Sequence, residues 1–122
     1  MKAHSLDAGF DLQATKGLVV YPNQIFRVGT GIEADIPPGH VGLVCARSGL
    51  ALKHGVVPVN APGIIDAGYS GEIVVGLIKL TSGRYDIKSG DRIAQLVVVP
   101  LSAYVPGLTS DRGEAGFGST GQ

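Results

Sequence analysis

Short runs of valine, isoleucine and leucine recur along the chain, and clusters of turn-forming residues separate them. The runs span residues 17–20, 25–32, 41–45, 56–59, 72–80 and 92–99. The clusters between them are rich in glycine, proline, asparagine and serine, which favour the backbone dihedrals of turns. Short strands every ~8–12 residues, without long helical patterns between them, are typical of a sandwich, jelly roll or barrel. We therefore expect a single all-β domain of distorted jelly-roll or barrel-like form.

One short helix is predicted between two of the strand-like runs. Residues 48–54 begin with Ser48, continue with helix formers and end in Lys53 and His54, and Gly55 follows. Serine is a favoured N-cap, cationic residues favour the last turn, and glycine commonly ends a helix. The segment predicts a helix of about two turns with Ser48 as its N-cap.

Length, charge and cysteine content limit the class of protein. The chain has 122 residues, 44% of them hydrophobic, and no apolar stretch approaches the ~20 residues that span a bilayer. Ten basic residues balance ten acidic ones, so net charge gives no reason to expect nucleic-acid or membrane binding. The single Cys45 cannot form an intrachain disulfide, and the N-terminus lacks the apolar core of a secretion signal. We expect a cytoplasmic or other intracellular protein.

Residues 107–122 differ from the rest of the chain in composition. They hold five glycines and several hydroxyl side chains, with Phe117 as their one aromatic residue. This is too little apolar surface to order the segment alone. We expect a β domain over residues 1–106 and a flexible C-terminal arm over residues 107–122.

Glycines and charged residues concentrate in five short segments, at residues 8–12, 47–49, 60–72, 90–95 and 112–121. Arg47 and Ser48 at the start of the predicted helix form an anion site, although a serine cap beside an exposed arginine explains the same residues. Glycines, hydroxyls and Arg112 in the last segment form a phosphate cradle, although a flexible linker has the same composition. Asp66 and Tyr69 offer a carboxylate and a phenol, or only a hairpin turn with a packed ring.

In order, residue types and spacing, the five segments resemble the five motifs of the trimeric dUTP pyrophosphatase (dUTPase) family. Any one of them is a weak signal, whereas five in sequence over nearly the whole chain are highly specific. The resemblance implies hydrolysis of dUTP to dUMP and pyrophosphate with Mg²⁺. This reaction limits uracil incorporation into DNA and supplies dUMP for thymidylate synthesis. The resemblance also implies a homotrimer whose active sites are shared between subunits.

The resemblance further implies a role for individual residues. Asp66 matches the catalytic carboxylate, and Tyr69 matches the ring that lies against the deoxyribose. Asp11 matches an aspartate that reaches Mg²⁺ indirectly, through water. The uracil-reading hairpin corresponds to Asn60, Gly63, Ile64 and Ile65. The contacts to the rest of the substrate correspond to Arg47, Ser48, Gly49, Gln95, Arg112, Gly118, Ser119 and Thr120, and Phe117 corresponds to the ring that stacks on uracil.

Two other functions are weighed against this one. The related dCTP deaminases place a catalytic glutamate where this chain has Gly76, so deamination lacks its expected acid or base. A non-catalytic nucleotide sensor or a structural jelly-roll protein would have no need for Asp66 together with the arm. One cysteine and three scattered histidines do not supply the spacing of a zinc site.

Overall fold

The computed structural model describes residues 7–109, which form nine β-strands and one short helix. In chain order they are β1 (Phe10–Gln13), β2 (Leu18–Val20), β3 (Ile25–Glu33), β4 (His40–Cys45), α1 (Ser48–His54), β5 (Val56–Pro58), β6 (Gly63–Asp66), β7 (Glu72–Lys79), β8 (Tyr85–Ile87) and β9 (Arg92–Pro100). All six predicted strand runs are confirmed, with bounds that differ by at most one residue.

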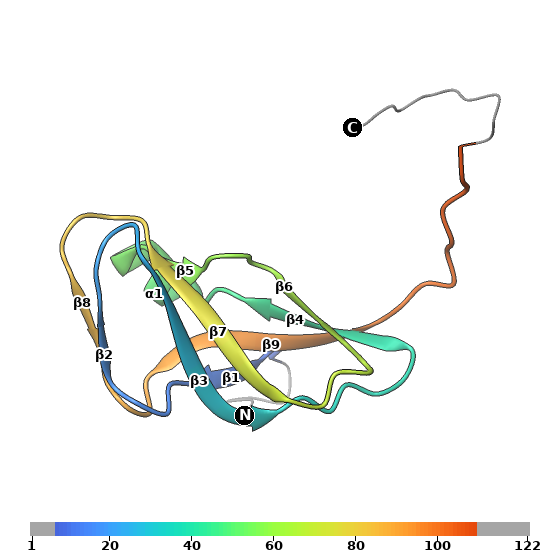
Figure 1. The fold of residues 1–122 in the computed structure, drawn as a ribbon, viewed down its shortest axis with the longest axis horizontal. Helices are drawn as coiled ribbons and strands as arrows, with labels where there is room; N and C mark the ends of the chain where they lie inside the picture. Colours follow the sequence, from blue (N-terminus) through green and yellow to red (C-terminus); the bar gives the residue numbers. More distant parts are fainter. Residues whose placement is uncertain (1–6, 110–122) are drawn as a thin grey trace.

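The strands form two layers and a small ribbon. One sheet has the order β1-β9-β4-β6, a second has the order β3-β7-β5, and β2 pairs with β8. All of these pairings are antiparallel. In Figure 1, β3 and β7 lie in front of β1, β9 and β4. Within the described residues the sheets do not close into a barrel, so the fold is jelly-roll-like.

The hydrophobic core lies between the two sheets. Leu12 and Val44 point into it from the first sheet, and Val28, Val75 and Leu77 point into it from the second. Each of these side chains is at most 6% exposed. Because side chains alternate across a strand, the neighbouring residues of the same strands point away from the core. That leaves each sheet with an outer face, and the candidate site lies on these faces.

The helix forms where it is predicted, but its N-cap is not Ser48. Arg47 has the extended backbone of an N-cap (φ −94°, ψ 129°), and its carbonyl accepts the first helical hydrogen bond from the N–H of Ala51 at 2.9 Å. Ser48 is the first helical residue, and no side chain caps the helix. Gly55 ends the helix in the left-handed region (φ 67°, ψ 22°), as predicted. With seven residues, this helix of the described part is too short to cross a membrane.

After β9 the chain leaves the body of the domain. The last backbone hydrogen bond that ties it down runs from the N–H of Leu101 to the carbonyl of Gly39, at 2.8 Å. Residues 101–109 then extend away from the sheets (Figure 1) and carry exposed apolar side chains, among them Tyr104, Val105 and Leu108. The predicted arm residues Arg112, Phe117, Gly118, Ser119 and Thr120 lie outside the described residues.

Candidate active site

Three of the predicted site residues, Asp11, Gln95 and Asp66, lie on one outer face, that of the β1-β9-β4-β6 sheet. Directly paired residues of antiparallel strands point to the same side. Asp11 pairs with Gln95, and Gln95 pairs with Cys45 on β4. Asp66 pairs instead with Val41, four residues further along β4, which is about 13 Å. We call the region of Asp11, Arg47, Arg92 and Gln95 the polar end, and residues 60–69 the hairpin end.

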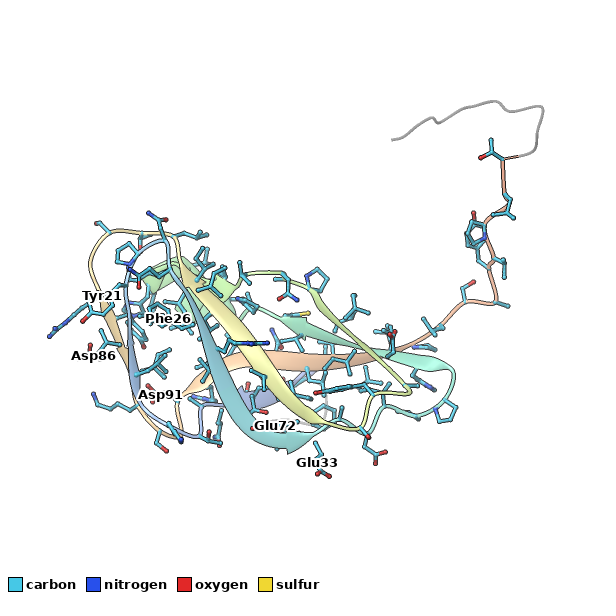
Figure 2. All side chains as sticks on the ribbon, in the orientation of Figure 1. Tyr21, Phe26, Glu33, Glu72, Asp86 and Asp91 are labelled. Atoms are coloured by element: carbon cyan, nitrogen blue, oxygen red, sulfur yellow. The ribbon has the colours of Figure 1, made fainter. Side chains whose placement is uncertain are left out.

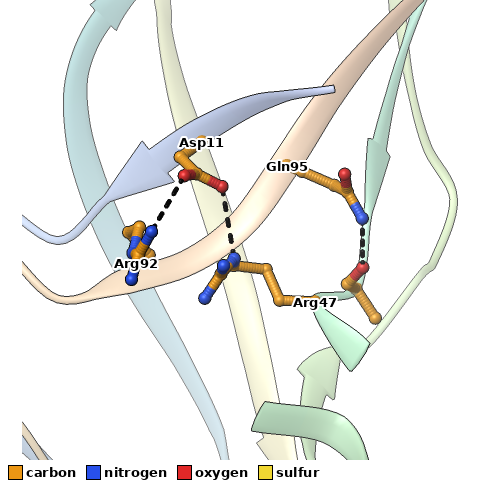
Figure 3. Close-up of polar contacts among 5 residues, drawn as sticks. Asp11, Arg47, Arg92 and Gln95 are labelled. Atoms are coloured by element: carbon orange, nitrogen blue, oxygen red, sulfur yellow. Dashed lines mark hydrogen bonds and ion pairs between the residues drawn. The ribbon is translucent and has the colours of Figure 1, made fainter. Parts of the chain in front are cut away.

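Two arginines flank a single carboxylate at the polar end. Nε of Arg47 lies 3.2 Å from Oδ1 of Asp11, and Nη1 of Arg92 lies 3.5 Å from Oδ2 (Figure 3). The Asp11 side chain is 21% exposed and that of Arg47 is 30% exposed, so this pair is partly shielded from solvent. Each carboxylate oxygen therefore orients one guanidinium, and the remaining N–H groups of both are free to meet an anion.

Arg92 was not assigned a role from the sequence, and a β-bulge explains why. Leu12 pairs with Ala94, so regular alternation would place Ile93 opposite Gln13. The register shifts by one residue at this point, and Arg92 pairs with Gln13 instead. The bulge turns Arg92 to the side of Asp11, while Ile93 and Ala94 are both buried. A bulge carries no simple sequence signal, so the sequence alone does not show on which side of β9 this arginine lies.

Gln95 is held in one orientation. Its Nε2 donates a hydrogen bond to the carbonyl of Ala46 at 2.9 Å, across to the chain segment that follows β4 (Figure 3). A side chain on Gly9 would collide with Oε1 of Gln95, so glycine is required there for the amide to lie close to the backbone. This arrangement fixes Gln95 beside Arg47.

The polar end encloses a small cavity of about 310 Å³. Four predicted substrate contacts, Arg47, Ser48, Gly49 and Gln95, line it together with Asp11. Arg92, Asp7, Ala8 and Gly9 complete the lining. Two guanidiniums, a hydroxyl and an amide converge here, which are donors suited to phosphate oxygens. The structure thus places Gln95, which the resemblance implies as a substrate contact, beside Arg47 and Ser48, which were predicted as an anion site.

The hairpin end lines a larger cavity of about 780 Å³. All six predicted hairpin residues contribute to it, namely Asn60, Gly63, Ile64, Ile65, Asp66 and Tyr69. The rest of its lining comes from β3, β4, β5–β6 and β7, and consists of Ile25, Arg27, Val44, Val59, Glu72, Ile73, Val74, Val75 and Gly76. Apolar and polar side chains share this lining, which suits a ring system that carries polar groups on its edge.

Asp66 ends β6 and begins a turn. Gly63 and Ile65 are buried, whereas Ile64 and Asp66 are exposed, as alternation requires. The N–H of Tyr69 donates to the carbonyl of Asp66 at 3.1 Å and closes the turn. The Asp66 carboxylate makes no recorded ion pair within residues 7–109, so it is available to accept a proton or to orient a water.

Tyr69 is fixed although its ring is half exposed. Its hydroxyl donates to the carbonyl of Glu72 at 2.8 Å. A Cβ on Gly71 would lie 2.6 Å from Oη of Tyr69, so the ring passes directly over a residue that must be small. Glu72 is tied in turn to β3, because its Oε2 accepts from the N–H of Gly31 at 2.8 Å, and it lies near Glu33 in Figure 2. These contacts present one face of the Tyr69 ring to the cavity.

The chain does not form a protein-only metal centre within its described part. No group of three or more histidine, cysteine, aspartate or glutamate residues there is placed to hold a metal ion. Asp11, the residue predicted to reach Mg²⁺ through water, forms ion pairs with both Arg47 and Arg92 in this structure.

Comparison with known proteins gives a consistent result. A family model described as dUTPase matches residues 1–121. The deoxyuridine 5'-triphosphate nucleotidohydrolase of Leifsonia xyli subsp. xyli is 49% identical over 125 residues, covering 98% of this chain and 82% of the relative. The enzyme of the same name from Clostridium kluyveri is 44% identical over 124 residues, covering 98% of this chain and 87% of its own.

Solved structures with the same fold include phage enzymes. A mutant dUTPase of the staphylococcal phage 80alpha has a TM-score of 0.80 and 30% identity, covering 98% of this chain and 90% of its own. Another mutant of that enzyme was solved with dUpNHpp, at a TM-score of 0.80 and 28% identity over 93% of this chain and 88% of its own. A dUTPase mutant from phage phi11 of S. aureus, described as coordinating a structural Mg(II) ion, has a TM-score of 0.78 and 29% identity over 93% of this chain and 88% of its own.

Proposed function

This chain belongs to the dUTPase family, and we propose that it hydrolyses dUTP to dUMP and pyrophosphate with Asp66 activating the attacking water. The observation that carries the proposal is the presence of two cavities, one at the hairpin end that contains the Asp66 carboxylate and one at the polar end that contains two guanidiniums. A nucleoside triphosphate has the same two parts, a flat base with its sugar and a chain of phosphates. The reaction removes dUTP as a source of uracil in DNA and yields dUMP for thymidylate synthesis.

The hairpin end holds the nucleoside. Asn60 and the backbone of Gly63, Ile64 and Ile65 form one wall of the cavity and offer the polar groups that pair with the edge of uracil. Tyr69 lies against the deoxyribose with the exposed face of its ring, and its hydroxyl is already engaged by the Glu72 carbonyl. The ring therefore acts through its shape, and leaves no space for a 2′-hydroxyl.

The polar end holds the phosphates. Arg47, Arg92, Ser48 and Gln95 donate to phosphate oxygens, and Asp11 keeps both guanidiniums in place. Formation of dUMP requires the bond between the α- and β-phosphates to break. Donors fixed before the reaction stabilise the charge that moves onto the leaving pyrophosphate, which is the largest contribution a protein makes to phosphoryl transfer.

Asp66 is the general base. Its carboxylate orients a water and takes a proton from it as the oxygen attacks phosphorus, and such a base contributes about 10²–10⁴-fold to the rate. The deaminase reaction lacks its expected acid or base, because Gly76 stands where the related dCTP deaminases place a catalytic glutamate.

The residues present fit a Mg²⁺ ion that arrives with the triphosphate. Mg²⁺ keeps several waters and is commonly held by substrate phosphates with one or two carboxylates, so the lack of a carboxylate cluster among the described residues is no obstacle. Asp11 would hold a water of the ion. When bound, the ion supplies positive charge to the phosphate oxygens.

The two ends come together between subunits of a homotrimer. Within one chain Asp11 and Asp66 lie about 13 Å apart along the strand direction, and they also lie on the two opposite edge strands of the sheet. Partly exposed apolar side chains fill the outer face between them, from Val41 and Leu43 on β4 to Val97 and Val99 on β9. A second copy that covers this apolar strip places its hairpin end against the polar end of the first. The arm, with Arg112, Phe117, Gly118, Ser119 and Thr120, then closes over the nucleotide.

Purified protein incubated with dUTP, dCTP, dTTP and UTP tests the function directly. We expect release of pyrophosphate from dUTP, with little from the other three. Ammonia released from dCTP would support the deaminase instead, and binding of dUTP without cleavage would support a nucleotide sensor.

Mixing two inactive variants tests the shared site. Asp66→Asn removes the base from the hairpin end, and Arg47→Met removes a guanidinium from the polar end. If each site takes its ends from two chains, unfolding and refolding the two variants together restores part of the activity, because some sites combine two intact ends. Activity that stays absent in the mixture, with the trimer present by sedimentation, would place both ends of a site on one chain.

A further inference from the structure

Helix α1 carries Ser48 and Gly49, which line the polar cavity, yet packing against the core holds this helix at one point only. Leu50 is its single buried residue. At its N-terminal end, the side chain of Arg47 is held by the ion pair with Asp11. A helix of seven residues with so little buried surface depends on the contacts that hold its ends.

The loop that joins β7 to β8 holds the C-terminal end of α1. Oγ1 of Thr81 donates to the carbonyl of His54, the last helical residue, at 2.9 Å. The N–H of Leu80 donates to the carbonyl of Gly55 at 2.8 Å, and the ring of His54 lies against that of Tyr85, with centroids 4.4 Å apart. Figure 1 shows α1 at the same end of the domain as this loop. The last carbonyls of a helix lack partners within it, and Thr81 supplies one.

A buried ammonium group holds Thr81 in turn. Lys79 is the last residue of β7 and is 4% exposed. Its Nζ donates to Oγ1 of Thr81 at 2.6 Å, to the carbonyl of Thr81 at 3.2 Å and to the carbonyl of Ser82 at 2.9 Å. An ammonium has three N–H donors, so these bonds satisfy all of them. No ion pair within residues 7–109 involves Lys79, so its partners here are neutral oxygens of one loop.

Thr81 therefore joins Lys79 to the helix, and we call Lys79, Thr81 and the carbonyl of His54 the helix clamp. The Thr81 hydroxyl accepts from a charged donor, which strengthens it as a donor to the His54 carbonyl. A buried charge adds little net stability compared with an apolar side chain, but its hydrogen bonds specify one arrangement of the groups around it. Because helical hydrogen bonds join the two ends of α1 over only ~10 Å, fixing the C-terminal end also fixes the end that carries Ser48.

We propose that Lys79 and Thr81 are positioning residues for the phosphates of the substrate, and that they act through α1. The inference rests on the proposed function, because it takes the phosphates to lie at the polar end, where Ser48 and Gly49 line the cavity. Neither Lys79 nor Thr81 belongs to the lining of the two cavities, so neither touches the substrate. Releasing the clamp should displace α1 and weaken the phosphate contacts. The cavity of the hairpin end contains no residue of the clamp, so the nucleoside should bind as before.

Binding of dUMP and of the analogue dUpNHpp, measured by calorimetry with Mg²⁺, separates the two ends of the site. The ratio of the Kd of dUMP to that of dUpNHpp reports the contribution of the outer phosphates. Thr81→Val removes the hydroxyl and keeps the shape of an exposed side chain, and we expect it to lower this ratio about 5- to 10-fold, because the donors lose their alignment. Thr81→Ser restores the hydroxyl and should keep the parent's ratio. Lys79→Met should lower the ratio as Thr81→Val does.

Hydrogen exchange shows whether the clamp acts through the helix. The N–H of Gly55 donates to the carbonyl of Ala51, and the N–H of Ala51 donates to that of Arg47, so the two report on opposite ends of α1. Both should exchange faster in Thr81→Val than in the parent. A lowered ratio with exchange like the parent's at both N–H groups would overturn the route through α1.

Thr15→Val is the matched control. Thr15 is also an exposed threonine whose Oγ1 donates to a backbone carbonyl, that of Gly29 at 3.2 Å, and it lies outside both cavities. It should lower the free energy of unfolding by a similar amount and leave the ratio unchanged. The inference is overturned if Thr81→Val keeps the parent's ratio, or if Thr15→Val lowers the ratio as much. The Thr81 variants give the answer if Lys79→Met does not fold. A parent that binds dUpNHpp no more tightly than dUMP would instead contradict the proposed function, which places the phosphates at the polar end.

Discussion

The two ends of the outer face are held in place by different forces. At the polar end, charge does the positioning: one carboxylate orients two guanidiniums, and an amide is fixed by a backbone carbonyl. At the hairpin end, backbone and space do it: a turn closes on Asp66, and the Tyr69 ring lies over a glycine. The polar end should therefore respond to changes of charge and salt, whereas the hairpin end should respond to changes of shape.

Asp66→Asn should have the largest effect, because it removes the proposed general base from the hairpin end. The amide keeps the size of the side chain but cannot take a proton, so kcat should fall about 10²–10⁴-fold. Binding of dUTP, measured by calorimetry, should be almost unchanged. Asp86→Asn, an exposed aspartate on β8 away from both cavities (Figure 2), is the control. Near-normal turnover of the Asp66→Asn variant would show that Asp66 is not the general base.

Asp11→Asn should lower kcat about 10- to 100-fold, because Arg47 and Arg92 lose the carboxylate that orients them. The polar end also becomes more positive, so KM for dUTP should hold or fall. Steady-state kinetics at low and high salt separate these effects, since the gain in affinity should fade as salt screens it. A rise in KM at both salt concentrations would mean that Asp11 contributes to binding by some other route.

Tyr69→Ala should change sugar selection. Loss of the ring lowers kcat/KM for dUTP, but the value for UTP should fall less, because space opens for the 2′-hydroxyl. The ratio of the two should drop about tenfold, which is the size expected when a buried hydroxyl no longer lacks a partner. Parallel assays with dUTP and UTP give the ratio. If it stays at the parent's value, the Tyr69 ring serves only to pack the hairpin.

Tyr69→Phe should have the smallest effect and is the matched control for the alanine variant. It keeps the ring over Gly71 but loses the hydrogen bond to the Glu72 carbonyl. The free energy of unfolding should fall by about 0.5–1.5 kcal/mol, measured by urea denaturation. Sugar selection should be kept. A loss of selection as large as in Tyr69→Ala would assign it to the hydroxyl and not to ring shape.

Much of the fold could be predicted from local patterns, and the exceptions have identifiable causes. The six apolar runs all form strands, whereas β8 (Tyr85–Ile87) was not among them, because Asp86 interrupts its apolar residues. Ser48 satisfies every local rule for an N-cap, yet Arg47 takes that position with an extended backbone, and its side chain is engaged by Asp11 on another strand. Such long-range contacts are not visible in a local segment.

The site could be predicted only in part, because its geometry also depends on long-range contacts. Motifs identify which residue types belong to it, and these residues do gather at the two cavities. The sequence does not show how far apart the cavities lie, because that depends on the registers of β6 and β9 against β4. Nor does it show Arg92, which a shift in register brings to the outer face.

That shift has a consequence for the length of β9. The outer face needs Arg92 and Gln95 to point the same way, and a regular strand with one residue fewer between them would satisfy that need. The additional residue serves the interior, where Ile93 and Ala94 are 1% and 0% exposed. Deleting Ala94 would thus preserve the order of charges outside, while Ile93 would move into the buried position opposite Leu12, so the cost would fall on core packing. Single-residue deletions, which are usually disruptive in a strand, become a means of separating stability from chemistry at this position.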